Sequence, residues 1–194
     1  TLTPVLLECG GKDAMIVAAD ADVRAAADAA AWGGMANAGQ TCIGIERVYA
    51  VEEVYDEFVA ALAERARTLR PGAAYGPATM PAQLEVIRRH VTDALARGGR
   101  AVVGGAGSVR PPYAYPTVLV DVPEDAAAVR EETFGPTLTV TRVADVDEAV
   151  EKANASAYGL GAAVFARSGG EAIARRIRSG MTSVNSVLSY AGVG

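Results

Sequence analysis

Short apolar runs alternate with helical stretches along most of this chain, and this alternation limits its fold more than any other feature. Apolar runs of about five residues suit strands buried on both faces, whereas apolar residues three and four apart suit helices. Strands are predicted at 14–18, 47–51, 101–103, 118–122, 138–143, 162–165 and 182–185. Because helices separate most of these strands, we predict an α/β fold, a mainly parallel twisted sheet with helices on both faces.

Capping residues and helix breakers mark the helix ends. The predicted helices cover 23–36, 54–69, 81–95, 145–154 and 168–178. Asp20 or Asp22 could cap the first helix, and Pro81 suits the first turn of the third. The last two helices open with the spacing of a capping box, Asp145-x-x-Glu148 and Ser168-x-x-Glu171.

Composition restricts the class of protein. The 194 residues are 51% hydrophobic, which fits one domain with a sizeable core. The net charge is −5, and the clustered arginines close predicted helices, where cations offset the helix dipole, so we expect no nucleic-acid partner. Two cysteines favour a reducing, cytoplasmic setting, and no apolar run approaches the roughly 20 residues of a membrane span.

Cys42 is the first candidate for chemistry. It lies in Gly39-Gln-Thr-Cys-Ile-Gly44, between a helix that ends at glycine and a strand, so it is expected on a loop or turn. Cysteine is a strong side-chain nucleophile, and loops on a rigid scaffold often carry nucleophiles. The alternative from spacing alone is a buried, inert thiol.

Glu8 is the second candidate. It follows two leucines and precedes Cys9 and a glycine pair in Leu6-Leu-Glu-Cys-Gly-Gly-Lys12. Partial desolvation by the leucines would raise its pKa toward the range of a general base, and the glycines would let another group approach the backbone. The alternative is an exposed glutamate in a turn.

The segment Glu131-Glu-Thr-Phe-Gly-Pro136 is the third candidate. Its acidic residues could bind hydroxyl groups, and Phe134 could present a ring to a planar ligand. The alternative is a polar turn with one core aromatic.

His90, the only histidine, would be needed for a cysteine–histidine dyad of the hydrolase type. It falls within a predicted helix with no turn signal nearby, so we expect it at the surface or helix edge. Since no Cys, His, Asp and Glu cluster has metal-ligand spacing, no metal is predicted.

Taken together, these segments resemble the aldehyde dehydrogenase family. Leu7-Glu-Cys-Gly-Gly-Lys12 resembles its glutamate motif, Asn37-Ala-Gly-Gln-Thr-Cys42 its cysteine motif, and Glu131-Glu-Thr-Phe-Gly-Pro136 its E-E-x-F-G-P motif. Arg47-Val-Tyr49, Tyr158-Gly-Leu160 and Gly180-Met-Thr-Ser-Val-Asn185 fit its other segments, in the same order. The resemblance covers the whole chain, and several motifs in register are far more specific than one.

The resemblance implies a role for each matching residue. Cys42 would attack an aldehyde, form a thiohemiacetal and then a thioester, and Glu8 would activate the water that hydrolyses it. Cofactor-binding residues would be Glu132 at the nicotinamide ribose, Phe134 near the nicotinamide and Gly10. The implied substrate-binding residues are Thr41, Ile43 and Asn185.

It also implies what lies outside the chain. Residues 1–194 would form the cysteine-bearing catalytic domain of a longer enzyme, with a domain that binds NAD or NADP and a C-terminal oligomerisation segment elsewhere. The full-length enzyme is expected to be a homo-oligomer, a dimer or tetramer. We therefore predict that this chain alone has no dehydrogenase activity.

The substrate is expected to be a small aldehyde. Enzymes of the family that act on succinic semialdehyde often carry arginine just before the asparagine of the cysteine motif, and this chain has Ala36 there. A relative that transfers the acyl group to coenzyme A would typically lack a glutamate at position 8, so Glu8 favours hydrolysis. Cys9, where leucine is usual, is expected to be a small packed side chain, with a regulatory disulfide as the alternative.

Overall fold

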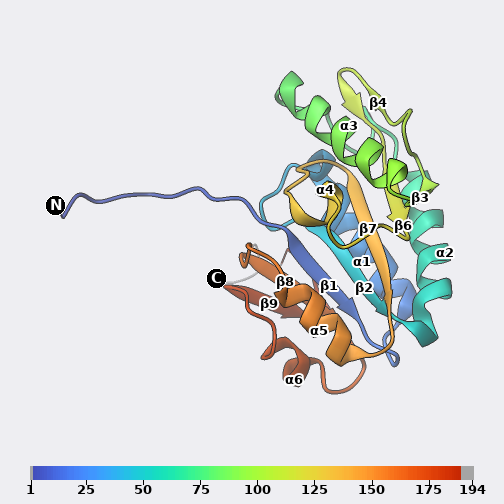
Figure 1. Ribbon diagram of the computed structural model, residues 1–194, viewed down its shortest axis with the longest axis vertical. Coiled ribbons are helices and arrows are strands. Elements are labelled where there is room, and N and C mark those ends of the chain that lie inside the picture. The colour runs from blue at the N-terminus through green and yellow to red at the C-terminus, as the bar shows by residue number, and fades with distance from the viewer. Residues whose placement is uncertain (1, 189–194) are drawn as a thin grey trace.

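A computed structural model describes residues 2–188 (Figure 1). Its main sheet has seven strands in the order β3-β6-β7-β2-β1-β8-β9. The strands are β1 Asp13–Val17, β2 Ile45–Val51, β3 Arg100–Val103, β6 Thr117–Val120, β7 Thr137–Val143, β8 Gly161–Phe165 and β9 Met181–Val184. Within the described residues, neighbouring strands are parallel except β3 and β6. The predicted fold class is confirmed.

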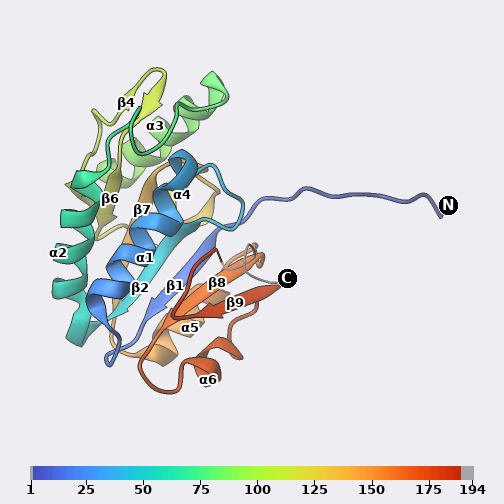
Figure 2. The ribbon, with the colours of Figure 1, turned by 180° about the vertical axis from the view of Figure 1, so that it is seen from behind.

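Helices cover both faces of the sheet. They are α1 Val23–Met35, α2 Glu52–Thr68, α3 Pro81–Ala96, α4 Ala127–Arg130, α5 Val146–Asn154 and α6 Gly170–Ala174, with a 3-10 turn at Ala36–Gly39. Figure 2 shows α1 and α2 across one face, and Figure 1 shows α5 and α6 on the other. The helix α3 and the hairpin of β4 (Val109–Arg110) and β5 (Tyr113–Ala114) lie toward the β3–β6 end. The short helix α4 packs against α3 through Ala128 and Val129. No helix within residues 2–188 has the length and hydrophobicity to span a membrane.

Strand β1 shows why the central strands read as continuous apolar runs. All five of its residues are buried, because helices cover both faces of the sheet. Side chains alternate along a strand, so Met15 and Val17 join the core under α1 and α2, whereas Ala14 and Ile16 join the core under α5.

Two of the predicted helix caps are confirmed. Asp22 accepts a hydrogen bond from the Ala25 N–H at 3.0 Å. Asp145 accepts one from the Glu148 N–H at 2.9 Å, and the Glu148 side chain accepts one in return from the Ala144 N–H at 2.7 Å. These bonds satisfy N–H groups that have no partner within the helix.

The predicted cap at Ser168 is wrong. Its hydroxyl donates to Asp20 at 2.6 Å instead, and Gly169 takes the N-cap position with a left-handed backbone, φ +70°. The helix also ends at Ala174 rather than near Arg178. The Ser168 hydroxyl therefore bonds to the distant carboxylate of Asp20 instead of accepting from the N–H groups of the helix.

Residues 2–10 are exposed and extend away from the domain, as Figures 1 and 2 show. Leu6 and Leu7 are 88% and 74% exposed. The expected desolvation of Glu8 by these leucines is therefore not found.

Candidate active site

The candidate residues gather at one edge of the sheet. Strands β1, β2 and β7 are parallel neighbours, so their amino ends meet at the same edge. The glycine pair precedes β1, the Cys42 loop precedes β2, and the segment from Glu132 to Pro136 precedes β7. Segments that are far apart in the sequence thus become neighbours.

Cys42 is half-buried on a turn directly before β2, as predicted. The turn closes with a 2.9 Å hydrogen bond from the Gly44 N–H to the Thr41 carbonyl. Thr41 and Ile43 flank the thiol and are also half-buried.

Three consecutive residues with left-handed backbone lead into the cysteine loop. They are Asn37, Ala38 and Gly39, with φ of 53°, 60° and 71°. A Cβ atom at Gly39 would lie 2.1 Å from the Gly135 carbonyl oxygen. Only glycine therefore lets the cysteine loop pack this closely against the turn before β7.

The glycine pair joins the cysteine loop to Glu132. A Cβ atom at Gly11 would lie 2.2 Å from the Cys42 carbonyl oxygen, and one at Gly10 would lie 2.3 Å from the Glu132 carboxylate. The Gly11 N–H also donates to Glu132 Oε1 at 2.8 Å. The structure therefore places Gly10, Cys42 and Glu132 next to one another.

Glu132 and Phe134 are half-buried beside this junction. Burial raises the pKa of Glu132, an effect that the hydrogen bond from Gly11 opposes. The Glu132 N–H donates to the Tyr158 hydroxyl at 3.3 Å. Phe134 has a left-handed backbone, φ 48°.

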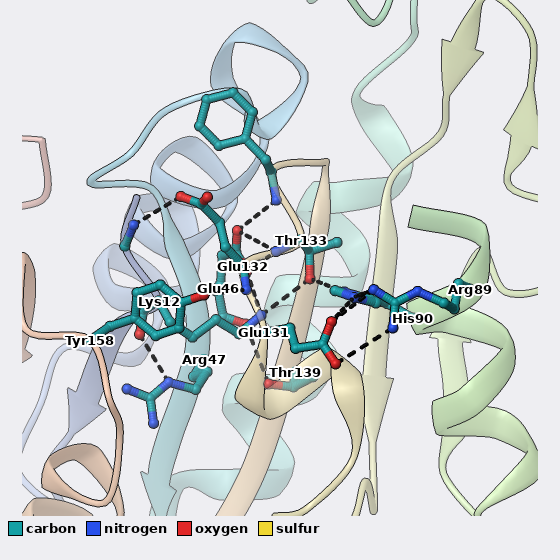
Figure 3. A network of polar contacts seen from close by, with 12 residues as sticks. Lys12, Glu46, Arg47, Arg89, His90, Glu131, Glu132, Thr133, Thr139 and Tyr158 are labelled. Atoms are coloured by element: carbon teal, nitrogen blue, oxygen red, sulfur yellow. Dashed lines mark hydrogen bonds and ion pairs between the residues drawn. The ribbon is translucent and has the colours of Figure 1, made fainter. Parts of the chain in front are cut away.

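A buried polar network lies behind these residues (Figure 3). Glu46, 4% exposed, forms an ion pair with Lys12, which is 1% exposed and donates to Thr133 Oγ1 at 3.1 Å. The Glu46 carboxylate also accepts from the N–H groups of Thr133 and Phe134. Burial lowers the pKa of Lys12, and Glu46 opposes this by favouring the ammonium form.

His90 belongs to the same network, so its predicted surface position is wrong. It is 0% exposed, and one ring nitrogen lies 3.0 Å from Thr133 Oγ1. The other lies 3.0 Å from the Arg89 guanidinium. Because a guanidinium only donates, a neutral ring bonded to Arg89 accepts there and carries its proton on the nitrogen facing Thr133. The ring nitrogen facing Arg89 also lies 3.4 Å from Glu131 Oε2. Both nitrogens are thus engaged away from Cys42, which disfavours a cysteine–histidine dyad.

The sequence patterns did not point to the charged side chains at the amino ends of β1 and β2. The second strand was predicted to start only at Arg47. Arg47 donates to the carbonyls of Lys12 and Ala153 at 3.0 and 3.3 Å. Asp13 accepts from the Gly161 N–H at 3.0 Å, and burial raises the pKa of Asp13 to about 7. The signal was present, since Glu46 and Arg47 interrupt an otherwise apolar run.

Glu8 and Cys9 are not held in the site. Both are exposed, and Glu8 forms no hydrogen bond with the residues that the structure describes. Cys9 and Cys42 are free thiols. The packed position expected for Cys9 is therefore not found.

Asn185 lies at the opposite edge of the sheet. It follows the carboxyl end of β9, whereas Cys42 precedes the amino end of β2. Its amide accepts from the Ala166 N–H at 3.0 Å and donates to the Ala166 carbonyl at 2.9 Å. These bonds tie the chain to the end of β8, and a contact of Asn185 with substrate stays a prediction.

Among residues 2–188, no three His, Cys, Asp or Glu side chains are grouped so that they could hold a metal ion.

Comparison with known proteins gives one consistent result. A model of the aldehyde dehydrogenase family matches residues 1–192. A Deinococcus radiodurans protein named succinate-semialdehyde dehydrogenase (NADP(+)) is 40% identical over 199 residues, covering 98% of this chain and 42% of the relative. A Mycobacterium ulcerans protein, provisionally named a succinate-semialdehyde dehydrogenase (NADP(+)), is 42% identical over 194 residues. That match covers 95% of this chain and 38% of the relative. The chain thus spans about two fifths of these relatives.

Solved structures agree. NADP-dependent glyceraldehyde-3-phosphate dehydrogenase from Bacillus halodurans, in complex with NADP, superimposes with a TM-score of 0.90 at 31% identity. That match covers 96% of this chain and 40% of the other. Lactaldehyde dehydrogenase from Escherichia coli gives a TM-score of 0.88 at 32% identity, over 93% of this chain and 40% of that one.

Proposed function

Because the chain belongs to the aldehyde dehydrogenase family, we propose that its full-length protein oxidises an aldehyde to a carboxylic acid with NAD or NADP as hydride acceptor. The observation that supports this most is the position of Gly11. Its backbone packs against the Cys42 carbonyl and donates to the Glu132 carboxylate, so the three motif segments meet at one point.

Cys42 is the proposed nucleophile. Its thiolate adds to the aldehyde carbon and gives a thiohemiacetal, whose oxygen recovers its carbonyl bond when hydride leaves, and a thioester remains. A thiolate both attacks well and leaves well as an acyl carrier, which suits two successive steps. The backbone N–H of Cys42 is the proposed oxyanion donor.

Glu8 is the proposed general base for thioester hydrolysis. It would take a proton from water as that water attacks the thioester carbon, and the Cys42 thiolate would leave. Residues 2–10 are exposed here, so this role requires Glu8 to fold back over Gly10 and Gly11 toward the thiol. The glycine pair carries no side chains that would block the approach.

The residues present suit a nicotinamide nucleotide. Glu132 Oε1 is bound by Gly11, whereas Oε2 accepts no hydrogen bond from the described residues and is available for a ribose hydroxyl. Gly10 leaves no side chain above the carboxylate, and Phe134 is half-exposed beside it. When bound, the nicotinamide accepts the hydride. The residues that hold it would be Glu132, Phe134 and Gly10.

The substrate proposed is a small aldehyde, with semialdehydes as the first class to test. Two relatives have succinate-semialdehyde dehydrogenase names. Ala36 offers no cation for a second carboxylate, however, so that cation would have to come from other residues.

We also propose that the full-length protein is cytoplasmic and forms a homo-oligomer. Light scattering on the full-length protein tests the oligomeric state.

The decisive experiment measures NADH and NADPH formation by the full-length gene product over a panel of aldehydes, with and without coenzyme A. We expect reduction that does not need coenzyme A and is lost in Cys42→Ala. Reduction only with coenzyme A would instead support an acyl-transferring enzyme. No reduction with any aldehyde, by a folded protein whose Cys42 still reacts with iodoacetamide, would contradict the proposal.

The chain of residues 1–194 is a second test. We expect it to form no NADH or NADPH, because it spans only about two fifths of its relatives. Turnover by a polypeptide of only these residues would contradict this.

A further inference from the structure

We propose that Glu46 is a positioning residue for the nicotinamide nucleotide: its buried carboxylate holds the backbone of Thr133 and Phe134 and thereby orients the side chains of Glu132 and Phe134. The inference rests on the proposed function and deepens it. Glu46 itself is 4% exposed, so it would act through the neighbouring segment rather than by touching the nucleotide.

The first support is the geometry of the carboxylate. Glu46 Oε2 accepts from the Thr133 N–H at 2.8 Å, and Oε1 accepts from the Phe134 N–H at 2.8 Å. Both N–H groups precede β7 and are free of its ladder, which begins at Thr137. A charged acceptor on two consecutive N–H groups forms stronger bonds than a neutral one, so it fixes the direction of this segment.

The second support is the backbone conformation that Glu46 holds at Phe134. Phe134 has φ 48°, which is unfavourable for a residue with a side chain and persists only where surrounding contacts determine it. Its N–H bond to Glu46 is such a contact. Of the two side chains proposed to meet the nucleotide, Phe134 lies on the segment that Glu46 holds and Glu132 directly precedes it.

The third support is the link to the other side of Glu132. Lys12, the ion-pair partner of Glu46, follows Gly11, whose N–H binds the Glu132 carboxylate (Figure 3). Glu46 therefore fixes the chain on both sides of that carboxylate. Glutamine could not replace it, because its amide has one acceptor oxygen and would turn a donor toward either an N–H or the ammonium.

The competing explanation is that Glu46 serves only to neutralise buried Lys12. Removing one member of a buried pair leaves an uncompensated charge, which is destabilising in itself, whereas removing both is often tolerated. A double variant therefore separates the two roles. Lys12→Met/Glu46→Gln has no buried charge at this pair but lacks the carboxylate that holds residues 133 and 134.

The test uses the full-length gene product as wild type, Glu46→Gln, Lys12→Met/Glu46→Gln and Glu46→Asp. Glu148→Gln is the control, because it weakens the cap of α5 without touching the site. Dissociation constants for NADH and NADPH are measured by nucleotide fluorescence, together with melting temperatures and KM for nucleotide and aldehyde. These binding measurements do not depend on turnover.

We expect Glu46→Gln to weaken nucleotide binding at least tenfold. The double variant should regain most of the lost melting temperature but stay at least tenfold weaker. Its KM for nucleotide should rise, with KM for aldehyde within twofold of wild type. Glu46→Asp keeps both acceptor oxygens but withdraws them by one methylene, so it should bind less tightly than wild type and better than Glu46→Gln. The control should match wild type.

Binding by the double variant within twofold of wild type would overturn the inference, since Glu46 would then only balance Lys12. If neither Glu46→Gln nor the double variant folds, Glu46→Asp decides. Its carboxylate is withdrawn by one methylene while Lys12 stays paired, so unchanged nucleotide binding would overturn the inference too. Failure of the wild type to bind either nucleotide is a different result, because it removes the proposed function and the inference with it.

Discussion

The two halves of strands β1 and β2 bury different kinds of side chain. Toward the amino end lie Asp13, Glu46 and Arg47, all under 5% exposed, and each has polar partners. Toward the carboxyl end the same strands carry apolar residues, such as Ile16 and Val51. The polar exception is the Tyr49 hydroxyl, which accepts from Arg47. One pair of strands therefore supplies both the hydrophobic core and the support of the candidate site, and substitutions in the two halves should have different consequences.

The largest expected effect is on activity and belongs to the amino edge. Cys42→Ala should lower aldehyde oxidation by the full-length protein on the order of 10³-fold or more, because no other nucleophile would form the thioester. Its urea unfolding curve should match that of wild type. Cys9→Ala, which removes the exposed thiol, should keep its activity, and equal losses in both variants would refute a special role for Cys42.

The carboxyl half should affect stability instead. Ile16→Ala removes a fully buried side chain from the core under α5 and should lower the free energy of unfolding by about 2–5 kcal/mol. Urea unfolding of the 194-residue chain measures this loss. Alkylation of Cys42 by iodoacetamide in the folded protein should keep its wild-type rate, and a large change in that rate would break the proposed division between the halves.

Asp13 should make stability depend on pH. Its folded pKa is about 7 against an ordinary 3.8, so the folded state holds a proton that the unfolded state releases between these values. Its stabilising contribution is full below about pH 4 and is lost as the pH rises through 7, at up to about 1.4 kcal/mol per pH unit. Asp13→Asn should remove this slope and stabilise the chain by roughly 1–3 kcal/mol at pH 8. A slope unchanged by the substitution would contradict this.

His90 should give a smaller effect of the opposite sign. Burial lowers its pKa below the ordinary 6.5, so the unfolded state binds a proton more readily. The stability tied to neutral His90 is present above about pH 6.5 and is lost as the pH falls, by no more than about 1.4 kcal/mol per pH unit for one proton. His90→Gln should flatten urea midpoints measured between pH 5 and 7. A steeper decline in the variant would show that another group is responsible.

Local signals made much of the fold predictable. Apolar runs located the strands of the sheet, and Asp22 and Asp145 marked helix starts through bonds to N–H groups three residues away. The cap at Ser168 failed because its true partner, Asp20, lies 148 residues away in the sequence. Local spacing cannot rank a distant carboxylate against a nearby N–H group as the partner of a hydroxyl.

The candidate site was predictable only in its motifs. Glycine, cysteine and glutamate segments were recognised by resemblance, and the structure brings Gly10, Cys42 and Glu132 together. Glu46 was missed because its partners are backbone N–H groups 87 and 88 residues away, which no side-chain pattern marks. His90 was misplaced because the sequence gives no sign that its ring bonds to Thr133, 43 positions away.

The long separations in the Glu46 network have a consequence for how the protein is made. Its bonds join residues 34, 87, 88 and 121 positions apart, so the network closes only after residue 134 has been synthesised and β7 has docked beside β2. Contacts of such separation form slowly, because loop closure precedes any gain from them. The cysteine loop would emerge from the ribosome well before its surroundings exist. A change in the rate at which a small alkylating agent modifies Cys42 would therefore report when a nascent chain has completed its central sheet.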